Sequence, residues 1–287
     1  MSNYKAKTIE LIKSEIIKKY IITNFTNKKY KKWNCKTFFD DFVKDFANDS
    51  KKYPSTFNSI IINLYKELEK HLDVEFTVSK IRGVLRNFVP VTNKTIKAVT
   101  KEKKLEVPLE RALSKANKWH CQFNCLSGYP NGKYKRASID LVVGKKDDEE
   151  GYLIELKQWD WTGGHPFYAI IEIIVHFFCF IIVRAKEPTK FPGWKKFHLL
   201  IMAPNSYFPN EYLNHNISEM IKFFSNSLKE LKSMHKLNCD NCDIGIHKIP
   251  INLEDFLRLV KSNKNAFIKK DAELKTKDRD RLKIILQ

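Results

Sequence analysis

Three charged residues stand in two stretches that read as neighbouring strands. Asp140 lies in the stretch 138–144, where apolar side chains alternate with others, and Glu155 and Lys157 lie in the apolar stretch 151–157. A period of two is typical of a half-buried strand, and the charged residues between two glycines read as the turn of a hairpin. Glu155 and Lys157 project from one face because they are two residues apart. If Asp140 lies across the ladder on that face, two carboxylates and an ammonium converge.

Such a cluster favours a bound divalent cation. Two carboxylates held close together repel, and one of them takes up a proton unless a cation lies between them. Mg²⁺ prefers oxygen ligands, often one or two carboxylates together with substrate phosphate and water. The amine of Lys157 could orient or deprotonate a water molecule, or stabilise charge that develops on a phosphoryl group. The alternative is a cross-strand salt bridge on an exposed hairpin, but Leu153, Ile154 and Leu156 indicate a buried strand.

The elements expected around this hairpin alternate between helix and strand. A helix begins near Pro108, and a strand over 119–126 precedes the hairpin. After the hairpin, a Thr-Gly-Gly break leads into a very apolar helix over 165–184 and a strand over 196–202. The order helix, three strands, helix, strand predicts a fold of the α/β type in the broad sense (α+β), in which helices pack on a mixed sheet.

The flanking regions carry further elements. Apolar stripes at helical spacing predict helices over 9–20, 38–46 and 60–68. Downstream, the pattern predicts a helix, a strand and a helix over 217–234, 244–251 and 253–260. We therefore expect a mostly helical region over 1–104 and a second domain over 105–287.

The charge balance indicates a polyanionic partner or an anionic membrane surface. Lys and Arg number 52 against 33 Asp and Glu, a net charge of +19, and residues 1–104 hold 23 of the former against 11 of the latter. Lysine richness also accompanies an AT-rich genome. The candidate nucleic-acid contacts combine phosphate-neutralising cations with an aromatic ring that could stack on bases: Lys28, Lys29, Lys31, Lys32, Trp33, Lys80, Arg82 and Arg86. The alternative is a solvated surface with Trp33 packed inward.

The spacing from Asp140 to Glu155-Leu156-Lys157, on adjacent strands within that element order, resembles the PD-(D/E)xK nuclease superfamily. This superfamily includes most type II restriction endonucleases and many repair and defence nucleases. Ile139 stands where the proline of the motif would be, a mild departure because that position varies. The resemblance covers about residues 105–205 and implies a restriction-endonuclease-like αβββαβ core.

The resemblance also implies a role for each matching residue. Asp140 and Glu155 would bind Mg²⁺, for which Mn²⁺ can substitute, and the carbonyl of Leu156 would reach the same ion. Lys157 would position or activate the attacking water. The implied activity is endonucleolytic hydrolysis of phosphodiester bonds in DNA, in restriction or antiviral defence. An RNase of the same fold and a nucleic-acid-binding protein without activity are the alternatives, and double-strand cutting would favour a two-fold homodimer.

Polar residues on the flanking helices could belong to the same site. The superfamily often places a further glutamate on the helix before the strands, where Glu110 fits, with Glu106 as the second choice. In the apolar helix, Glu172 and His176 are i,i+4 neighbours. They read as a buried helix–helix polar pair, as a metal site, or as support for the active site.

A second set of potential metal ligands lies near the C-terminus. His235, Cys239, Cys242 and His247 offer four ligands that structural zinc accepts, within a short span. The alternative is a loop with two free cysteines between a helix and a strand.

The chain is expected to be intracellular and cytoplasmic, without a membrane span. Its six cysteines are scattered, and residues 1–10 carry no apolar run that would indicate a signal peptide. The most apolar run, 170–183, is interrupted by Glu172 and His176 and is shorter than the ~20 residues that a span needs. We therefore expect this run to be a buried core helix.

Overall fold

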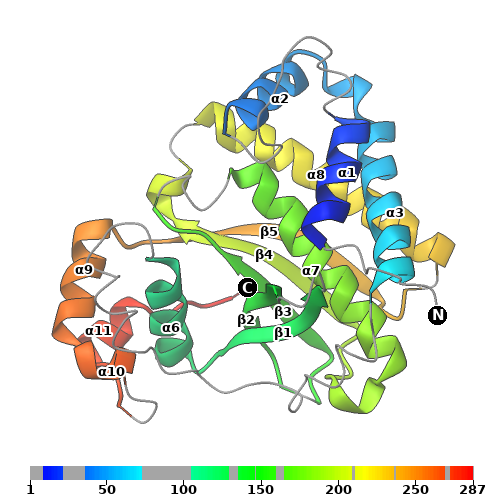
Figure 1. The fold of residues 1–287 in the computed structure, drawn as a ribbon. Helices are drawn as coiled ribbons and strands as arrows, with labels where there is room; N and C mark the ends of the chain where they lie inside the picture. The colour runs from blue at the N-terminus through cyan, green and yellow to red at the C-terminus, as the bar shows by residue number, and fades with distance from the viewer. Residues whose placement is uncertain are drawn as a thin grey trace.

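Helices cover both faces of a five-stranded sheet (Figure 1). The computed structural model describes residues 9–21, 36–72, 105–128, 135–145, 147–159, 165–208, 211–235, 237–268 and 272–286. The fold is of the mixed α+β class, as the alternation of elements in the sequence predicts.

The strands lie in the sheet in the order in which they occur along the chain. They are β1 (His120–Gly128), β2 (Lys135–Val143), β3 (Glu150–Leu156), β4 (Lys196–Pro204) and β5 (Asn241–Ile249). β2 is antiparallel to both β1 and β3, whereas β3, β4 and β5 run parallel. The predicted hairpin is confirmed, because β2 and β3 pair directly, with Leu141 opposite Ile154.

Every helix that the sequence periodicity predicts within the described residues is present. They are α1 (Ile9–Tyr20), α2 (Lys36–Asn48), α3 (Pro54–His71), α6 (Glu106–Asn117), α7 (Pro166–Lys186), α8 (Glu211–His235), α9 (Leu253–Ser262), α10 (Lys264–Ile268) and α11 (Thr276–Arg281). Single 3-10 turns occur at Ser50–Lys52, Pro188–Lys190 and Asn205–Tyr207. The succession α6, β1, β2, β3, α7, β4 has the expected order of helix, three strands, helix and strand.

Two apolar cores lie on opposite faces of the sheet. Val142 and Leu153 of the hairpin belong to the core formed with α7 and α8, and their neighbours Leu141 and Ile154 belong to the core formed with α6 and α9. Residues of α1, α2 and α3 contribute to the same core as α7 and α8. The described helices of the region 1–104 therefore pack into the core of the second unit, and Figure 1 shows α1 and α3 on the α7 side of the sheet.

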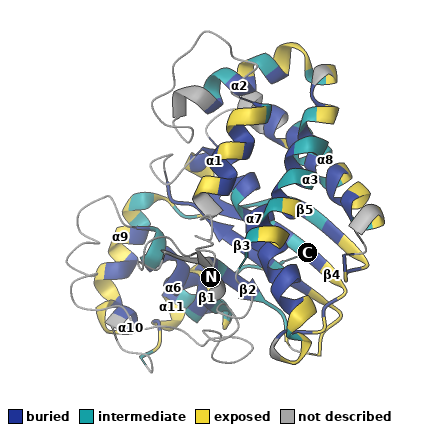
Figure 2. Ribbon diagram, turned by 45° about the vertical axis from the view of Figure 1, so that its right-hand side comes forward, coloured by how far each residue is buried: buried dark blue, intermediate teal, exposed yellow. Residues whose placement is uncertain are grey.

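α7 is the central helix of this arrangement. Within the described residues, it alone has the length and the apolar composition of a membrane span, and 94% of that window is buried inside the fold. In Figure 2 it is dark blue along most of its length, because the sheet and the neighbouring helices cover it. The prediction of a buried core helix is confirmed.

The basic segments predicted to contact nucleic acid lie outside the described residues. This holds for Lys28, Lys29, Lys31, Lys32, Trp33, Lys80, Arg82 and Arg86. Their role as contacts stays a prediction.

Trp194 packs against the turn end of the hairpin. Its ring is fully buried, and its indole N–H donates to the carbonyl of Lys145 at 2.6 Å. Gly144 has a φ of +126°, a conformation that residues with a side chain rarely adopt. Gly151 lies so close to the indole that a methyl group there would overlap the ring. A side chain at Gly151 is therefore excluded by overlap with Trp194, and one at Gly144 is disfavoured both by the backbone conformation and by overlap with the same ring.

We expect Gly151→Ala to lower the free energy of unfolding by about 1–3 kcal/mol, because overpacking displaces a buried ring. Urea denaturation measures the change. Gly193→Ala is the matched control, since no atom lies within 4 Å of a methyl group built there, and its effect should stay within about 0.5 kcal/mol. Equal effects of the two substitutions would contradict this account of the turn.

Candidate active site

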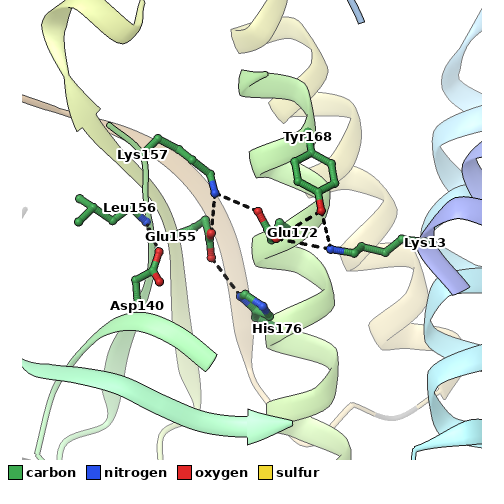
Figure 3. Close-up of polar contacts among 8 residues, drawn as sticks. All are labelled: Lys13, Asp140, Glu155, Leu156, Lys157, Tyr168, Glu172 and His176. Atoms are coloured by element: carbon green, nitrogen blue, oxygen red, sulfur yellow. Dashed lines mark hydrogen bonds and ion pairs between the residues drawn. The ribbon is translucent and has the colours of Figure 1, made fainter. Parts of the chain in front are cut away.

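Asp140 lies on β2 beside the C-terminal end of β3. The pairing of Leu141 with Ile154, extended by one residue, sets Asp140 opposite Glu155. Its carboxylate Oδ2 accepts a hydrogen bond of 2.8 Å from the backbone N–H of Leu156 (Figure 3). The carboxylate is thereby fixed against the segment that carries Glu155 and Lys157.

The ammonium of Lys157 lies between two carboxylates. Its Nζ donates to Glu155 Oε1 at 2.7 Å and to Glu172 Oε2 at 2.9 Å. The backbone N–H of Lys157 donates to the carbonyl of Met202 at 2.9 Å, which continues the line of β3 beyond its last residue. Glu155 is 4% and Lys157 3% exposed, so both charges are buried. Two of the three residues that the sequence singles out are therefore in direct contact, and Asp140 adjoins them through Leu156.

Two side chains of α7 complete the polar contacts on this face. Glu172 binds Lys157, and one turn further along α7 the ring nitrogen Nδ1 of His176 lies 3.1 Å from Glu155 Oε2. Figure 3 shows both side chains directed from the helix toward the end of β3. Glu172 contacts Lys157 beyond β3 and also Lys13 of α1, so it makes a buried helix–helix contact and supports the cluster as well. His176 contacts Glu155 and supports the cluster from the same face of α7.

Two glutamates of α6 add negative charge. Glu110 is 1% exposed, and Glu106 lies one turn earlier on the same helix. Burial raises the pKa of Asp140 well above its usual range, and the charges of Glu155, Glu106 and Glu110 raise it further, against the opposing effect of Lys157. Both glutamates of α6 are thus close enough to Asp140 to raise its pKa. The expected further glutamate at Glu110 and the second choice at Glu106 both lie beside the site.

Burial also raises the pKa of Glu106 to about 7. Lys157 opposes this shift, whereas Glu155 and Glu172 add to it. Glu106 therefore holds its proton mainly because its ionised carboxylate would be poorly solvated at this buried position.

Lys157 stays protonated in this setting. Burial alone would lower its pKa, but the charges of Glu155, Glu172, Glu106 and Asp140 outweigh burial and hold the pKa well above its ordinary value. An amine with such a pKa donates hydrogen bonds and positive charge at neutral pH and does not accept a proton.

Sequence reasoning missed Lys13 and Tyr168. Lys13 on α1 donates to the Tyr168 hydroxyl at 2.9 Å, and its Nζ lies 3.5 Å from Glu172 Oε1. The signal was present in the pattern: Lys13 stands in the apolar stripe of α1, directly after Ile12 and three residues before Ile16. A lysine in that stripe must be buried with a partner.

The donor set has the chemistry that a hard divalent cation requires. Asp140 and Glu155 offer carboxylate oxygens, which Mg²⁺ prefers. The N–H and C=O of one residue in an extended strand point to the same side, so the carbonyl of Leu156 faces the edge on which its N–H meets Asp140. Within the described ranges, no three His, Cys, Asp or Glu side chains converge closely enough to enclose a metal ion. The ammonium of Lys157 lies among the carboxylates, where it supplies part of the positive charge.

The predicted zinc set is not brought together by the described residues. Cys239 and Cys242 are buried free thiols that line one cavity. His247 stands five residues beyond Cys242 on β5, opposite Met202 of β4, which separates the two by roughly 16 Å along an extended strand. The side chain of His235 lies outside the described part of the chain. His247 therefore cannot share a metal with the cysteines.

No protein-family model matches the chain, and neither a curated protein nor a solved structure does. The residues of the site and their chemistry are therefore the basis for a functional proposal.

The raised pKa of Glu106 makes a prediction about stability and pH. In the folded protein, Glu106 keeps its proton between pH 4.5 and about 7, whereas the unfolded chain has lost it. The free energy of unfolding should therefore fall as the pH rises through this window. In Glu106→Gln, the free energy of unfolding should decrease less between pH 4.5 and pH 8 than in the wild type, by up to about 3 kcal/mol. Urea denaturation across this pH range in the presence of a chelator measures the difference.

The matched control is Glu149→Gln, which changes an exposed glutamate of the hairpin turn. Its pH dependence should coincide with that of the wild type. If Glu106→Gln also follows the wild-type curve, the acid cluster does not perturb Glu106 as described.

Proposed function

We propose that this protein is a Mg²⁺-dependent nuclease that hydrolyses phosphodiester bonds in DNA and has a restriction-endonuclease-like core. The observation that carries the proposal is the meeting of Asp140, Glu155 and Lys157 at the end of β3. The order of elements around them supports the same conclusion, since it is the order that the resemblance to the PD-(D/E)xK superfamily implies.

Asp140 and Glu155 are the residues proposed to bind Mg²⁺, together with the carbonyl of Leu156. Oδ2 of Asp140 accepts the N–H of Leu156, and this hydrogen bond leaves lone pairs of the carboxylate for a metal ion. When bound, the ion would supply positive charge to the phosphate and to the leaving oxygen. The carboxylates of Glu155, Glu106 and Glu110 lie near enough to Asp140 to raise its pKa in addition to burial, and this gathering of acids supports the assignment.

Lys157 acts in this proposal as a charged donor. Hydrolysis forms a bond between a water oxygen and phosphorus and breaks the bond to the leaving oxygen. The water gives up a proton to solvent, and the leaving oxygen takes up a proton from solvent to become a hydroxyl group. The ammonium, fixed by Glu155 and Glu172, donates a hydrogen bond that orients the water or stabilises the negative charge that develops on the phosphoryl group. The hydrogen bonds to Glu155 and Glu172 hold the ammonium in the orientation that these roles require.

The net charge of +19 supports a polyanionic substrate. The described part of the chain carries no feature that selects DNA over RNA. A role in restriction or antiviral defence is the biological context that we propose, by analogy with the superfamily.

Incubation of supercoiled plasmid, linear duplex DNA and single-stranded RNA with and without Mg²⁺ tests the activity. We expect DNA cleavage that requires Mg²⁺ or Mn²⁺, and Asp140→Ala should reduce the rate by about 10³-fold or more, since loss of the ion removes several kcal/mol of transition-state stabilisation. Asp147→Asn, a change of an exposed acid in the hairpin turn, is the control and should cut like the wild type. Cleavage of RNA alone would assign an RNase, and no cleavage of either polymer would leave only a binding role.

Binding of Mg²⁺ can be measured without substrate. A ligand that binds only the folded state stabilises it by about 2.7 kcal/mol at 100 times its dissociation constant. We expect Mg²⁺ to raise the melting temperature of the wild type but not that of Asp140→Asn, and to do so more strongly at pH 8 than at pH 6, because the acids must lose their protons to bind the ion. An equal rise in both proteins would place the ion elsewhere.

A further inference from the structure

We propose that Lys13 of α1 is a positioning residue of the active site, which acts through Glu172 to hold the ammonium of Lys157 in place. This inference rests on the proposed function and adds to it a residue from outside the αβββαβ succession. The consequence is that the helical N-terminal region is part of the catalytic unit as well as a candidate for substrate binding.

The contacts form a continuous chain of alternating charge. Lys13 lies 3.5 Å from Glu172 Oε1, and the other oxygen of Glu172, Oε2, accepts the ammonium of Lys157 at 2.9 Å. Lys157 continues to Glu155. Each oxygen of the Glu172 carboxylate thus faces a different ammonium, which leaves this carboxylate little freedom to rotate (Figure 3).

Tyr168 contacts both Lys13 and Glu172 in this series of ion pairs. Its hydroxyl accepts the hydrogen bond from Lys13 at 2.9 Å and lies 3.4 Å from Glu172 Oε1, to which it donates. Tyr168 and Glu172 stand one turn apart on α7, and Lys13 comes from α1. The three side chains join α7 to α1 at the point where α7 meets the site.

Packing gives α1 a defined position over the site. Ile12, Ile16 and Ile17 on either side of Lys13 are buried in the core that α7 and the hairpin share. Lys13 itself is 1% exposed, so it cannot contact substrate directly. It can act on the site only through the groups that it touches.

Stability alone does not explain a lysine at this position. A buried ion pair is typically no more stabilising than apolar side chains of similar size, and the neighbours in the stripe are isoleucines. What Lys13 adds is charge at Glu172. Burial would raise the pKa of Glu172, but Lys157, Lys13 and His176 outweigh burial and hold it below its usual value, so the carboxylate stays ionised.

The test compares Lys13→Met with the wild type in the full chain. Methionine keeps the apolar packing of α1 but removes one partner of a buried carboxylate, so the melting temperature should fall. The rates are therefore compared at a temperature at which both proteins are fully folded. We expect kcat to fall about 10–100-fold with KM within twofold, as for other residues that orient an active-site group through a second side chain. Lys13→Arg should restore most of the rate, and Lys18→Met, an exposed change on the same helix, should leave kcat unchanged.

A double substitution separates a positioning role from a general loss of structure. If Lys13 acts through Glu172, then Lys13→Met should have little further effect on kcat in a Glu172→Gln background. Multiplicative losses in the double variant, or a wild-type kcat for Lys13→Met, would overturn the proposal.

A readout that needs no activity keeps the proposal distinct from the proposed function. In protein labelled with ¹⁵N-lysine, the Lys157 ammonium resonance is assigned by its absence in Lys157→Met. We expect this resonance to shift or to exchange faster with water in Lys13→Met, but not in Lys18→Met. If the wild type cuts no nucleic acid but the resonance responds, the proposed function fails and the positioning role stands; an unchanged resonance overturns the positioning role.

Discussion

The buried ammonium of Lys157 is the interaction on which the polar centre of this protein depends. Its pKa is raised by four carboxylates, those of Glu155, Glu172, Glu106 and Asp140. These residues come from the hairpin, from α7 and from α6. Without that ammonium, several carboxylates would face one another in a region that excludes water, which is strongly unfavourable. The sheet and the helices on both of its faces are therefore joined at one electrostatic centre as well as by two apolar cores.

Further positive charge at the same centre, from bound protons or from a cation, would be electrostatically favourable. Burial raises the pKa values of Asp140 and of Glu106, and neighbouring carboxylates raise them further against the opposing effect of Lys157. A cluster of this kind can respond either by binding protons or by binding a cation, and which of the two occurs depends on pH and on the concentration of the ion. This property connects the stability of the fold to its proposed chemistry, because the groups that cost stability when ionised are those that would bind Mg²⁺ or influence its binding.

Much of the site could be predicted from local sequence patterns. The period of two in the hairpin places Glu155 and Lys157 on one face. The place of Asp140 opposite Glu155 depends in addition on the register between β2 and β3, which the alternation does not determine. The i,i+4 spacing of Glu172 and His176 showed that they share a face of α7, but it carried no information about what that face packs against. Their partners depend on how the helix crosses the sheet, which is set by tertiary packing.

The partner of Lys13 and the separation of the predicted zinc ligands also depend on tertiary structure. Lys13 was visible as a charge in an apolar stripe, but its partner on α7 is 159 residues away in the sequence (Glu172), and no local rule reaches that far. The zinc interpretation counted ligands within a short span and ignored that an extended strand moves His247 away from Cys242 by about 3.3 Å per residue. The basic segments before α2 and after α3 lie outside the described residues, and their contacts with nucleic acid stay a prediction.

Anomalous diffraction from crystals grown with Mn²⁺ would locate a metal ion at the end of β3. We predict a peak bound by Asp140, Glu155 and the carbonyl of Leu156, next to the ammonium of Lys157, and the loss of this peak in crystals of Asp140→Asn. A structure at saturating Mn²⁺ in which these carboxylates bind only Lys157 and His176, with no peak between Asp140 and Glu155, would contradict it.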